Sequence, residues 1–292
     1  MSSRERIEAL RQEGLAALRA NHGETALERF DEALALAPEP DQAEILTINK
    51  ARALVELRRS GPEVQALPRI VMRRENPLHT FLAAYTLLYK FRLDGEYERA
   101  GFYGRLALEL VDASGRPEWK AEVLLDLGNL CIFNSQSNEA IAFYEEALAL
   151  CDATPGRELA AAFAKQNLGY ARMISGEVET GIALIHEAMA LMTEIGAEGY
   201  IPESQIDLCY GYLELDNLEK ARHYGELGLE GALEDRQIRN AHYLLGEVLF
   251  KSGEVAGARR HFETLARYYP DFPNLTNLLL AIDLRRMVNL KL

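Results

Sequence analysis

Histidine and cysteine side chains, which carry much of the acid–base, nucleophilic and metal chemistry of proteins, are scattered along this chain. The three cysteines, Cys131, Cys151 and Cys209, are odd in number and widely spaced, which favours neither a disulfide framework nor a zinc site. The histidines lack the close spacing of a helical metal-binding motif. They are His22, His79, His186, His223, His242 and His261. We therefore expect a protein that is not an enzyme, with no catalytic residue, no cofactor and no metal site.

The chain repeats itself at a spacing of about 40 residues. The segment Ala147–Ala153 matches Ala107–Ala113, 40 residues upstream, at five of seven positions. Periods of 20–50 residues are typical of stacked supersecondary units, each buried only against its neighbours. Such stacking makes a long open surface, so the sequence indicates a protein that works by holding something against it.

Apolar residues recur at three- and four-residue intervals between short polar breaks, which predicts helical hairpins. We expect seven hairpins, beginning near residues 7, 47, 81, 121, 162, 202 and 239. Their turns are predicted at Asn21-His22-Gly23, Ser60-Gly61-Pro62, Asp94-Gly95-Glu96, Asn134–Asn138, Ser175-Gly176-Glu177, Asp216-Asn217 and Ser252-Gly253-Glu254. Glycine, asparagine and aspartate suit these turns because they tolerate a left-handed backbone or cap the next helix. The fold class predicted is all-α.

The hairpins resemble tetratricopeptide repeats (TPRs), a family that alternates small and large residues at helix crossings. The fourth hairpin carries Leu127, Gly128, Ala140, Tyr144 and Ala147, and the seventh carries Leu245, Gly246, Ala258, Phe262, Leu265 and Pro270. The match covers residues 7–270 and has the longer, roughly 40-residue period of expanded arrays. It implies an α-solenoid with a right-handed superhelix over residues 1–273, followed by a C-terminal capping or self-association helix over residues 274–292.

The resemblance also implies a groove, because the first helix of each hairpin lines the concave face of a TPR array. The expected groove residues flank the small packing position on those helices. They are Tyr85, Tyr89, Leu125, Asn129, Phe133, Gln166, Tyr170, Tyr210, Glu214, Tyr243, Glu247 and Phe250. Tyrosine offers a large apolar area with a hydroxyl group, which suits peptide binding. The alternative is that these tyrosines pack between adjacent repeats.

Charge further limits the partners of this chain. The formal net charge is −13, and residues 118–234 hold 6 Lys and Arg against 21 Asp and Glu. The acidic middle and the scarcity of basic clusters argue against nucleic acid. Glu214 and Glu247 favour a basic or polar ligand. A groove that grips a carboxylate is not expected, since Asn129 lacks nearby basic partners.

The compartment expected is the cytoplasm. The start of the sequence runs directly into a charged amphipathic pattern, without the apolar core of a signal peptide. The longest uncharged run, Asn76 to Tyr89, has 14 residues and is too short to cross a membrane.

Three functions remain open at this point. The first is a non-enzymatic scaffold or adaptor that binds a protein or peptide segment in the aromatic groove. The second is a structural unit that forms a homo-oligomer through residues 275–292, whose apolar stripe is wider than one helix face. The third is a ligand- or peptide-sensing module of a bacterial regulatory system.

Overall fold

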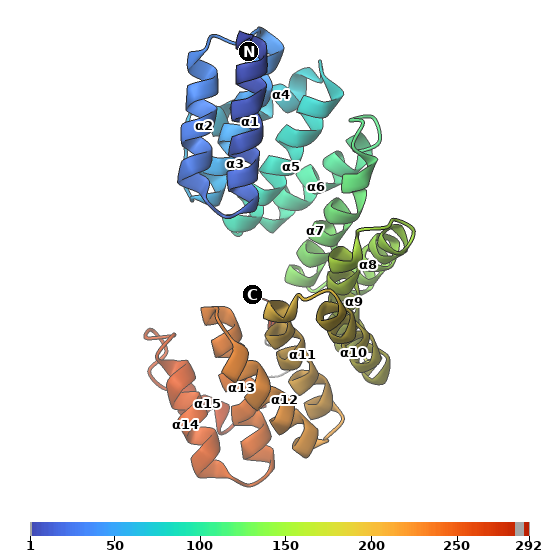
Figure 1. Ribbon diagram of the computed structural model, residues 1–292. Helices are drawn as coiled ribbons and strands as arrows, with labels where there is room; N and C mark the ends of the chain where they lie inside the picture. The colour runs from blue at the N-terminus through green and yellow to red at the C-terminus, as the bar shows by residue number, and fades with distance from the viewer. Residues whose placement is uncertain (1, 284–288, 292) are drawn as a thin grey trace. The chain divides into compact units, whose positions relative to one another are not determined.

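The computed structural model describes residues 2–283 and 289–291, and over these residues all regular elements are helices (Figure 1). The predicted all-α fold is confirmed. The chain divides into two compact units, unit 1 (Met1–Leu130) and unit 2 (Cys131–Leu292). The boundary falls within the helix α7 (Lys120–Phe133) and inside the array predicted for residues 1–273.

Unit 1 contains three complete helical hairpins and the start of a fourth. Its helices are α1 (Ser3–Arg19), α2 (Gly23–Ala35), α3 (Pro40–Glu56), α4 (Pro62–Arg73), α5 (Pro77–Leu93) and α6 (Tyr97–Leu110), followed by the 3-10 turn η1 (Pro117–Trp119) and α7. Each helix from α1 to α6 packs against the next. In addition, α3 contacts both α1 and α5. The first helices of successive hairpins therefore lie next to one another, as stacking of repeats requires.

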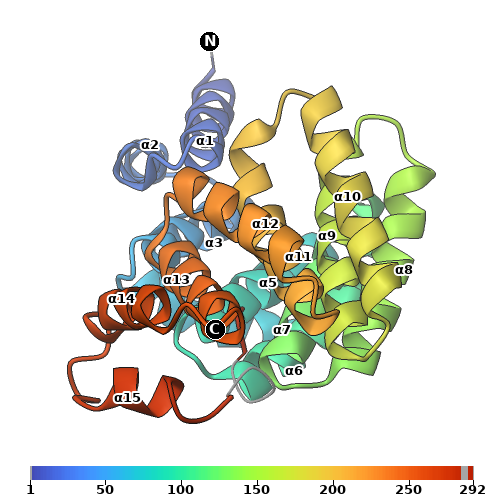
Figure 2. The same ribbon diagram turned by 90° about the horizontal axis from the view of Figure 1, so that it is seen from below.

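Unit 2 continues the same arrangement through three further hairpins. Its helices are α8 (Ser137–Asp152), α9 (Glu158–Ile174), α10 (Val178–Glu194), α11 (Ile201–Glu214), α12 (Leu218–Gly231), α13 (Asp235–Lys251), α14 (Val255–Ala266) and α15 (Leu275–Leu279), with the 3-10 turn η2 (Glu198–Tyr200) before α11. Again the first helices touch, α9 with α11 and α11 with α13 (Figure 2).

The hairpin turns share one hydrogen-bonding pattern. In each, the residue after a left-handed position donates its backbone N–H to the carbonyl five residues upstream, as in Glu96 to Phe91 and Glu254 to Leu249, both at 2.8 Å. The left-handed residues are Asn21, Arg58, Gly95, Ser135, Gly176, Asp216 and Gly253. The second turn is centred on Arg58, two residues before the predicted break, because Gly61 and Pro62 instead begin α4.

Small residues allow the helices of a hairpin to approach, and large residues fill the crossing. A Cβ atom added at Gly14 would overlap the ring of Phe30, and one added at Gly246 would overlap the ring of Phe262. Both rings are completely buried. The small and large positions of the TPR pattern therefore contact one another in unit 1 and in unit 2 alike.

The region after α14 contains one short helix within the described residues. The helix α15 has five residues, and residues 280–283 and 289–291 form turns or irregular structure. Residues 284–288 and 292 of the predicted terminal helix lie outside the described residues. A capping or self-association role for residues 274–292 therefore stays a prediction.

Candidate functional site

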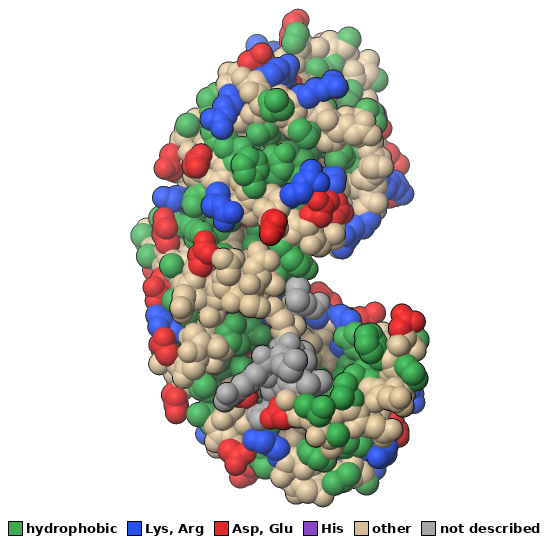
Figure 3. Space-filling model, turned by 180° about the vertical axis from the view of Figure 1, so that it is seen from behind, with side chains coloured by type: hydrophobic (Ala, Val, Ile, Leu, Met, Phe, Trp, Pro, Cys, Tyr) green, Lys and Arg blue, Asp and Glu red, His purple; other side chains and the backbone are tan. Residues whose placement is uncertain are grey.

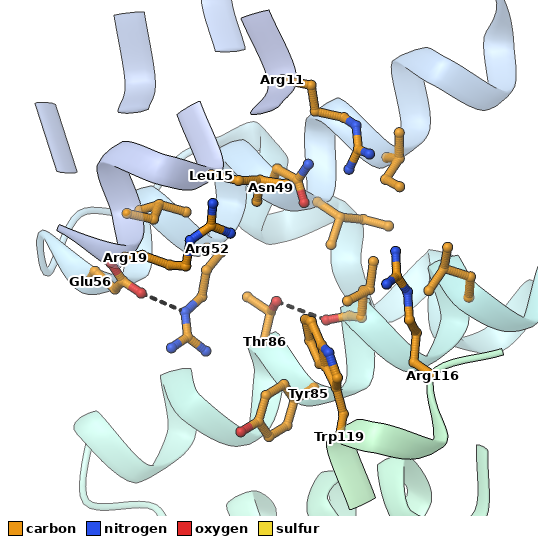
Figure 4. Close-up of a pocket in the computed structure, with 15 residues that line it drawn as sticks. Arg11, Leu15, Arg19, Asn49, Arg52, Glu56, Tyr85, Thr86, Arg116 and Trp119 are labelled. Atoms are coloured by element: carbon orange, nitrogen blue, oxygen red, sulfur yellow. Dashed lines mark hydrogen bonds and ion pairs between the residues drawn. The ribbon is translucent and has the colours of Figure 1, made fainter. Parts of the chain in front are cut away.

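A pocket of about 470 Å³ opens on unit 1 between the first helices of its hairpins. Its walls come from α1, α3, α5 and η1, the elements that TPR stacking places on one face (Figure 4). The apolar part of the lining consists of Leu15, Leu18, Ile45, Ile48, Leu78 and Leu82. An apolar pocket with a few convergent polar groups is the usual form of a binding site.

Four arginines and one carboxylate, Glu56, also line this pocket. In the view of Figure 4, Arg19 and Arg52 lie to one side and Arg11 and Arg116 to the other. Arg52 Nε donates to Glu56 at 2.7 Å, whereas the exposed Arg19 has no ion pair or hydrogen bond with any described residue. The positive charge therefore exceeds the negative charge in the lining, which favours an anionic group in the ligand.

Three of these arginines have additional partners that fix their position, and one of the three is Arg116, which forms an ion pair with Glu118 at 3.4 Å. Arg11 forms an ion pair with Glu8 at 2.8 Å, and that hydrogen bond lowers the pKa of the Glu8 carboxyl. The Arg52 guanidinium lies 3.6 Å from the centre of the Tyr89 ring, a cation–π contact. These contacts pre-organise the basic side chains at the pocket.

The most unusual member of the lining is Asn49 of α3. Its side chain is only 6 % exposed, and its amide nitrogen has no hydrogen-bond partner among the residues that the structure describes. Buried polar groups are nearly always paired, and leaving one unpaired costs about 1–3 kcal/mol. Asn49 is therefore an unsatisfied buried donor in the wall of the pocket.

Aromatic side chains form the wall of the pocket at η1. The ring of Trp119 packs edge-on against Phe81 at 5.7 Å and against Tyr85 at 6.1 Å, centre to centre. The Tyr85 hydroxyl donates to Asp126 at 2.8 Å, and burial together with that carboxylate raises the pKa of Tyr85 well above its ordinary value. Trp119 is thus both a packing residue and part of the pocket surface. On the face seen in Figure 3, hydrophobic side chains of the N-terminal half lie among Lys and Arg side chains.

The corresponding face of unit 2 is acidic and is occupied by the chain itself. Residues 289–291, here called the tail segment, lie against α7, α9, α11 and α13. The Lys291 ammonium donates to Glu203 at 2.7 Å and to the two Asp207 oxygens at 2.8 and 2.9 Å. It also lies 4.6 Å from the centre of the Tyr170 ring. The carboxylates and this ring together form a cation-binding site.

The rest of the tail segment is also held. The Asn240 amide of α13 donates to the Leu290 carbonyl, and the Asn289 amide donates to the Ile132 carbonyl of α7 at 2.8 Å. The Leu290 side chain is 3 % exposed. The segment therefore makes backbone, apolar and charged contacts, which are the three kinds a bound peptide makes.

The carboxylates differ in their electrostatic surroundings. Burial would raise the pKa of Glu203, but Lys291 and Arg236 outweigh it and bring that pKa to about 2. Arg236 makes two hydrogen bonds to Glu203, at 2.9 and 3.1 Å. Burial dominates at Asp207, whose pKa rises to about 6 in spite of Lys291 and of a 3.3 Å hydrogen bond from Gln166. The same carboxylates raise the pKa of Lys291 against the effect of its burial.

The predicted groove residues lie on the first helices of hairpins in both units, and several of them pack against a neighbouring first helix. Tyr85 on α5 contacts Asp126 on α7, and the rings of Tyr170 and Tyr210 lie 6.1 Å apart between α9 and α11. Gln166 and Tyr170 also contact the tail-segment site. Most of the others are partly or fully buried. They are Tyr89, Leu125, Asn129, Phe133, Glu214, Tyr243 and Glu247, whereas Phe250 is 38 % exposed.

Two sets of polar residues at these sites were not predicted from the sequence. Arg11, Arg19 and Asn49 lie on α1 and α3, helices that were left out of the predicted groove. Glu203 and Asp207 precede Tyr210 and Glu214 at helical spacing on α11, so the stripe that contains the two predicted residues could have indicated them. Nothing local indicates Lys291, which is 84 residues from Asp207.

In the described part of the chain, no cluster of histidine, cysteine, aspartate and glutamate side chains is arranged to hold a metal ion. The three cysteines are buried, and burial raises the pKa of the Cys209 thiol. Among the described helices, none combines the length and the apolar character needed to cross a membrane.

Comparison with known proteins shows similarity at the level of fold. No family model matches the sequence, and no curated protein matches it significantly. The apo form of RapI is 14 % identical, with a TM-score of 0.71 over 97 % of this chain and 85 % of that one. NprR in complex with its cognate peptide NprX is 13 % identical, with a TM-score of 0.72 over 94 % and 81 %.

A third similar structure is the STAND protein PH0952 of Pyrococcus horikoshii, which has a tetratricopeptide repeat sensor. It is 16 % identical, with a TM-score of 0.73 over 94 % of this chain and 44 % of that chain. All three likenesses extend over nearly the whole length of the present sequence. The chain therefore has the helical-repeat fold of tetratricopeptide-repeat proteins.

Proposed function

We propose that this chain is a non-enzymatic, peptide-binding helical-repeat protein and that the pocket of unit 1 is its ligand site. The observation that carries the proposal is the buried Asn49 amide, which faces a pocket and has no partner among the described residues. A side-chain amide in this position can hold the backbone carbonyl of an extended peptide. The similarity to NprR, whose structure contains its cognate peptide, supports a peptide as the class of ligand.

The chemistry of the lining selects among peptides. Arginine binds carboxylates in a planar, two-pronged geometry, and four arginines line this pocket. The leucine and isoleucine side chains favour an apolar residue beside the acidic one. We therefore infer a peptide segment with a carboxylate next to an apolar side chain. This preference is opposite to the basic ligand expected from the acidic middle of the sequence, because α1 and α3 supply charges that the predicted groove did not include.

A binding titration tests the pocket directly. Trp119 lines it and is the only tryptophan of the chain, so its fluorescence reports on the occupancy of this site. A randomised 12-residue peptide library is screened against the full chain, and selected peptides are then titrated. We expect selected peptides to carry an acidic residue beside an apolar one and to change the Trp119 emission. Arg19→Glu should weaken their binding by about tenfold, because it reverses the charge of an arginine without a partner among the described residues.

The matched control is Arg99→Glu on α6. Arg99 is exposed and forms an ion pair with Glu96 at 2.7 Å, and it is not part of the pocket lining. Its substitution should leave the affinity within about twofold, which is the scale of a surface charge effect. Equal losses in the two variants, or selected peptides that leave Trp119 emission unchanged, would remove this pocket as the ligand site.

Self-association through residues 275–292 stays a second prediction. It is favoured by the exposure of Leu278 and Ile282, which are 42 % and 50 % exposed. Apolar side chains exposed close together are typical of contact surfaces. A sensing role in a regulatory system would use the same peptide site as the adaptor role and differs from it only in the partner.

A further inference from the structure

Unit 2 contains a second surface that holds a chain segment. This surface carries carboxylates, whereas the charged residues that line the pocket of unit 1 are mainly arginines. The tail segment touches four first helices, α7, α9, α11 and α13, through only three residues. Its contacts involve one charged side chain, one apolar side chain and two amide–carbonyl hydrogen bonds. We call the surface formed by Tyr170, Glu203, Asp207 and Asn240 the tail groove.

The tail groove requires a cation. Asp207 is 1 % exposed, and Arg236 makes its hydrogen bonds to Glu203 instead. Lys291 is therefore the close cationic partner of Asp207, with contacts at 2.8 and 2.9 Å. With the tail segment in place Asp207 is buried, so a segment that filled the tail groove without a cation would leave a buried carboxylate unpaired, which is strongly destabilising. Whatever replaces the tail segment must bring a positive charge to the same place.

The tail groove also selects the type of residue that precedes the lysine. The Leu290 side chain is buried, and its carbonyl accepts a hydrogen bond from Asn240. The backbone contact is independent of sequence, whereas the buried side chain selects for apolar character. The pattern that fits is thus an apolar residue followed directly by lysine.

We propose that the tail groove is a second peptide-binding site, selective for an apolar residue followed by lysine, and that residues 289–291 are its intramolecular ligand. A partner segment of this pattern binds by displacing the tail segment. Because the resident ligand is tethered, it competes at an effective concentration of about millimolar, so external peptides bind weakly until the tail leaves. This site goes beyond the unit 1 pocket and does not depend on it.

The proposal is tested by removing the side chains of the tail segment from the tail groove and measuring the binding of a free peptide. The probe is the rhodamine-labelled peptide Val-Asn-Leu-Lys-Leu, the sequence of residues 288–292. Its binding to the full chain and to the double variant Leu290→Ala, Lys291→Ala is followed by fluorescence anisotropy. We expect the double variant to bind the probe at least tenfold more tightly than the unaltered chain. Adding Asp207→Asn to it should reverse this gain, and a probe with alanine in place of lysine should not bind.

The affinity of the vacated groove should fall with decreasing pH. Asp207 has a pKa of about 6 with a lysine bound, and losing the lysine charge raises that pKa further. The bound state therefore favours the ionised carboxylate, so affinity is full at high pH and is lost as the pH falls through about 6. Arg236 keeps its charge over this range, since its pKa is raised, and its hydrogen bonds to Glu203 favour the ionised form of that carboxylate in the vacated groove as well. The anisotropy titration at pH 8 and at pH 5.5 measures the difference, and equal affinities would contradict the role of Asp207.

The control for vacating the groove is Lys251→Ala, which removes an exposed lysine paired with Asp216 at 2.9 Å. It should leave probe binding as weak as in the unaltered chain. Circular dichroism establishes that the variants are folded. If the double variant is not folded, hydrogen–deuterium exchange on the unaltered chain replaces the anisotropy measurement. Unlabelled probe at millimolar concentration should then increase the exchange at residues 289–291. Equal probe binding with and without the tail side chains, binding independent of the probe lysine, or exchange unchanged by the probe would each overturn the proposal.

Discussion

Replacing Phe30 with alanine is expected to lower the free energy of unfolding of unit 1 by about 3–5 kcal/mol. The Phe30 side chain is completely buried and fills the space above Gly14, where even one added carbon atom would overlap it. It belongs to a cluster with Ile7, Leu10 and Leu46, which comes from three different helices. The cavity left by alanine would remain, because helices held by these other contacts cannot collapse into it.

Urea unfolding followed by Trp119 fluorescence measures this loss, because the single tryptophan lies in unit 1. The matched control is Phe102→Ala on α6, since Phe102 is 60 % exposed. Its cost should stay below about 1 kcal/mol. Similar costs for the two substitutions would show that Phe30 does not fill the helix crossing as described.

Replacing Asn49 with leucine is expected to change stability and binding in opposite directions. The substitution removes a buried amide without a partner among the described residues and keeps the number and branching of the side-chain heavy atoms. Removing this group should therefore raise the free energy of unfolding by about 1–3 kcal/mol. The same change removes the donor proposed to hold the peptide backbone, so affinity for library-selected peptides should fall by about tenfold.

Both effects are read from Trp119, by urea unfolding and by peptide titration. Gln12→Leu serves as the control, because Gln12 is exposed on α1 and its amide already donates to Glu8 at 2.7 Å. It should change stability by less than about 0.5 kcal/mol and leave affinity unchanged. An Asn49→Leu variant that is less stable than the unaltered chain would show that Asn49 has a structural role instead.

Much of the fold could be predicted from local sequence patterns. Glycine, asparagine and aspartate mark five of the seven hairpin turns, since these residues tolerate the left-handed backbone found at Gly95, Asn21 and Asp216. Arg58 shows the limit of this signal. It adopts the same conformation without being a typical turn residue, and the visible Gly61-Pro62 pair caused the turn to be placed two residues too late.

The candidate sites were less accessible to prediction, because they depend on contacts between distant residues. The TPR resemblance selected the first helices of the hairpins, and among its residues are Gln166 and Tyr170, which contact the tail-segment site. No periodicity indicates that Asn49 lacks a partner or that Lys291 reaches Asp207. Tyr85 packs between repeats and also lines a pocket, so its packing does not decide between the two original alternatives.

A crystal structure of the full chain with a library-selected peptide tests most directly whether the first helices of the hairpins form a peptide-binding face. We expect the peptide between α1, α3 and α5, with a backbone carbonyl at hydrogen-bonding distance from Asn49 Nδ2 and a carboxylate at Arg19. A peptide bound on the second helices of the hairpins, with the Asn49 amide still unpaired, would contradict the proposed binding face.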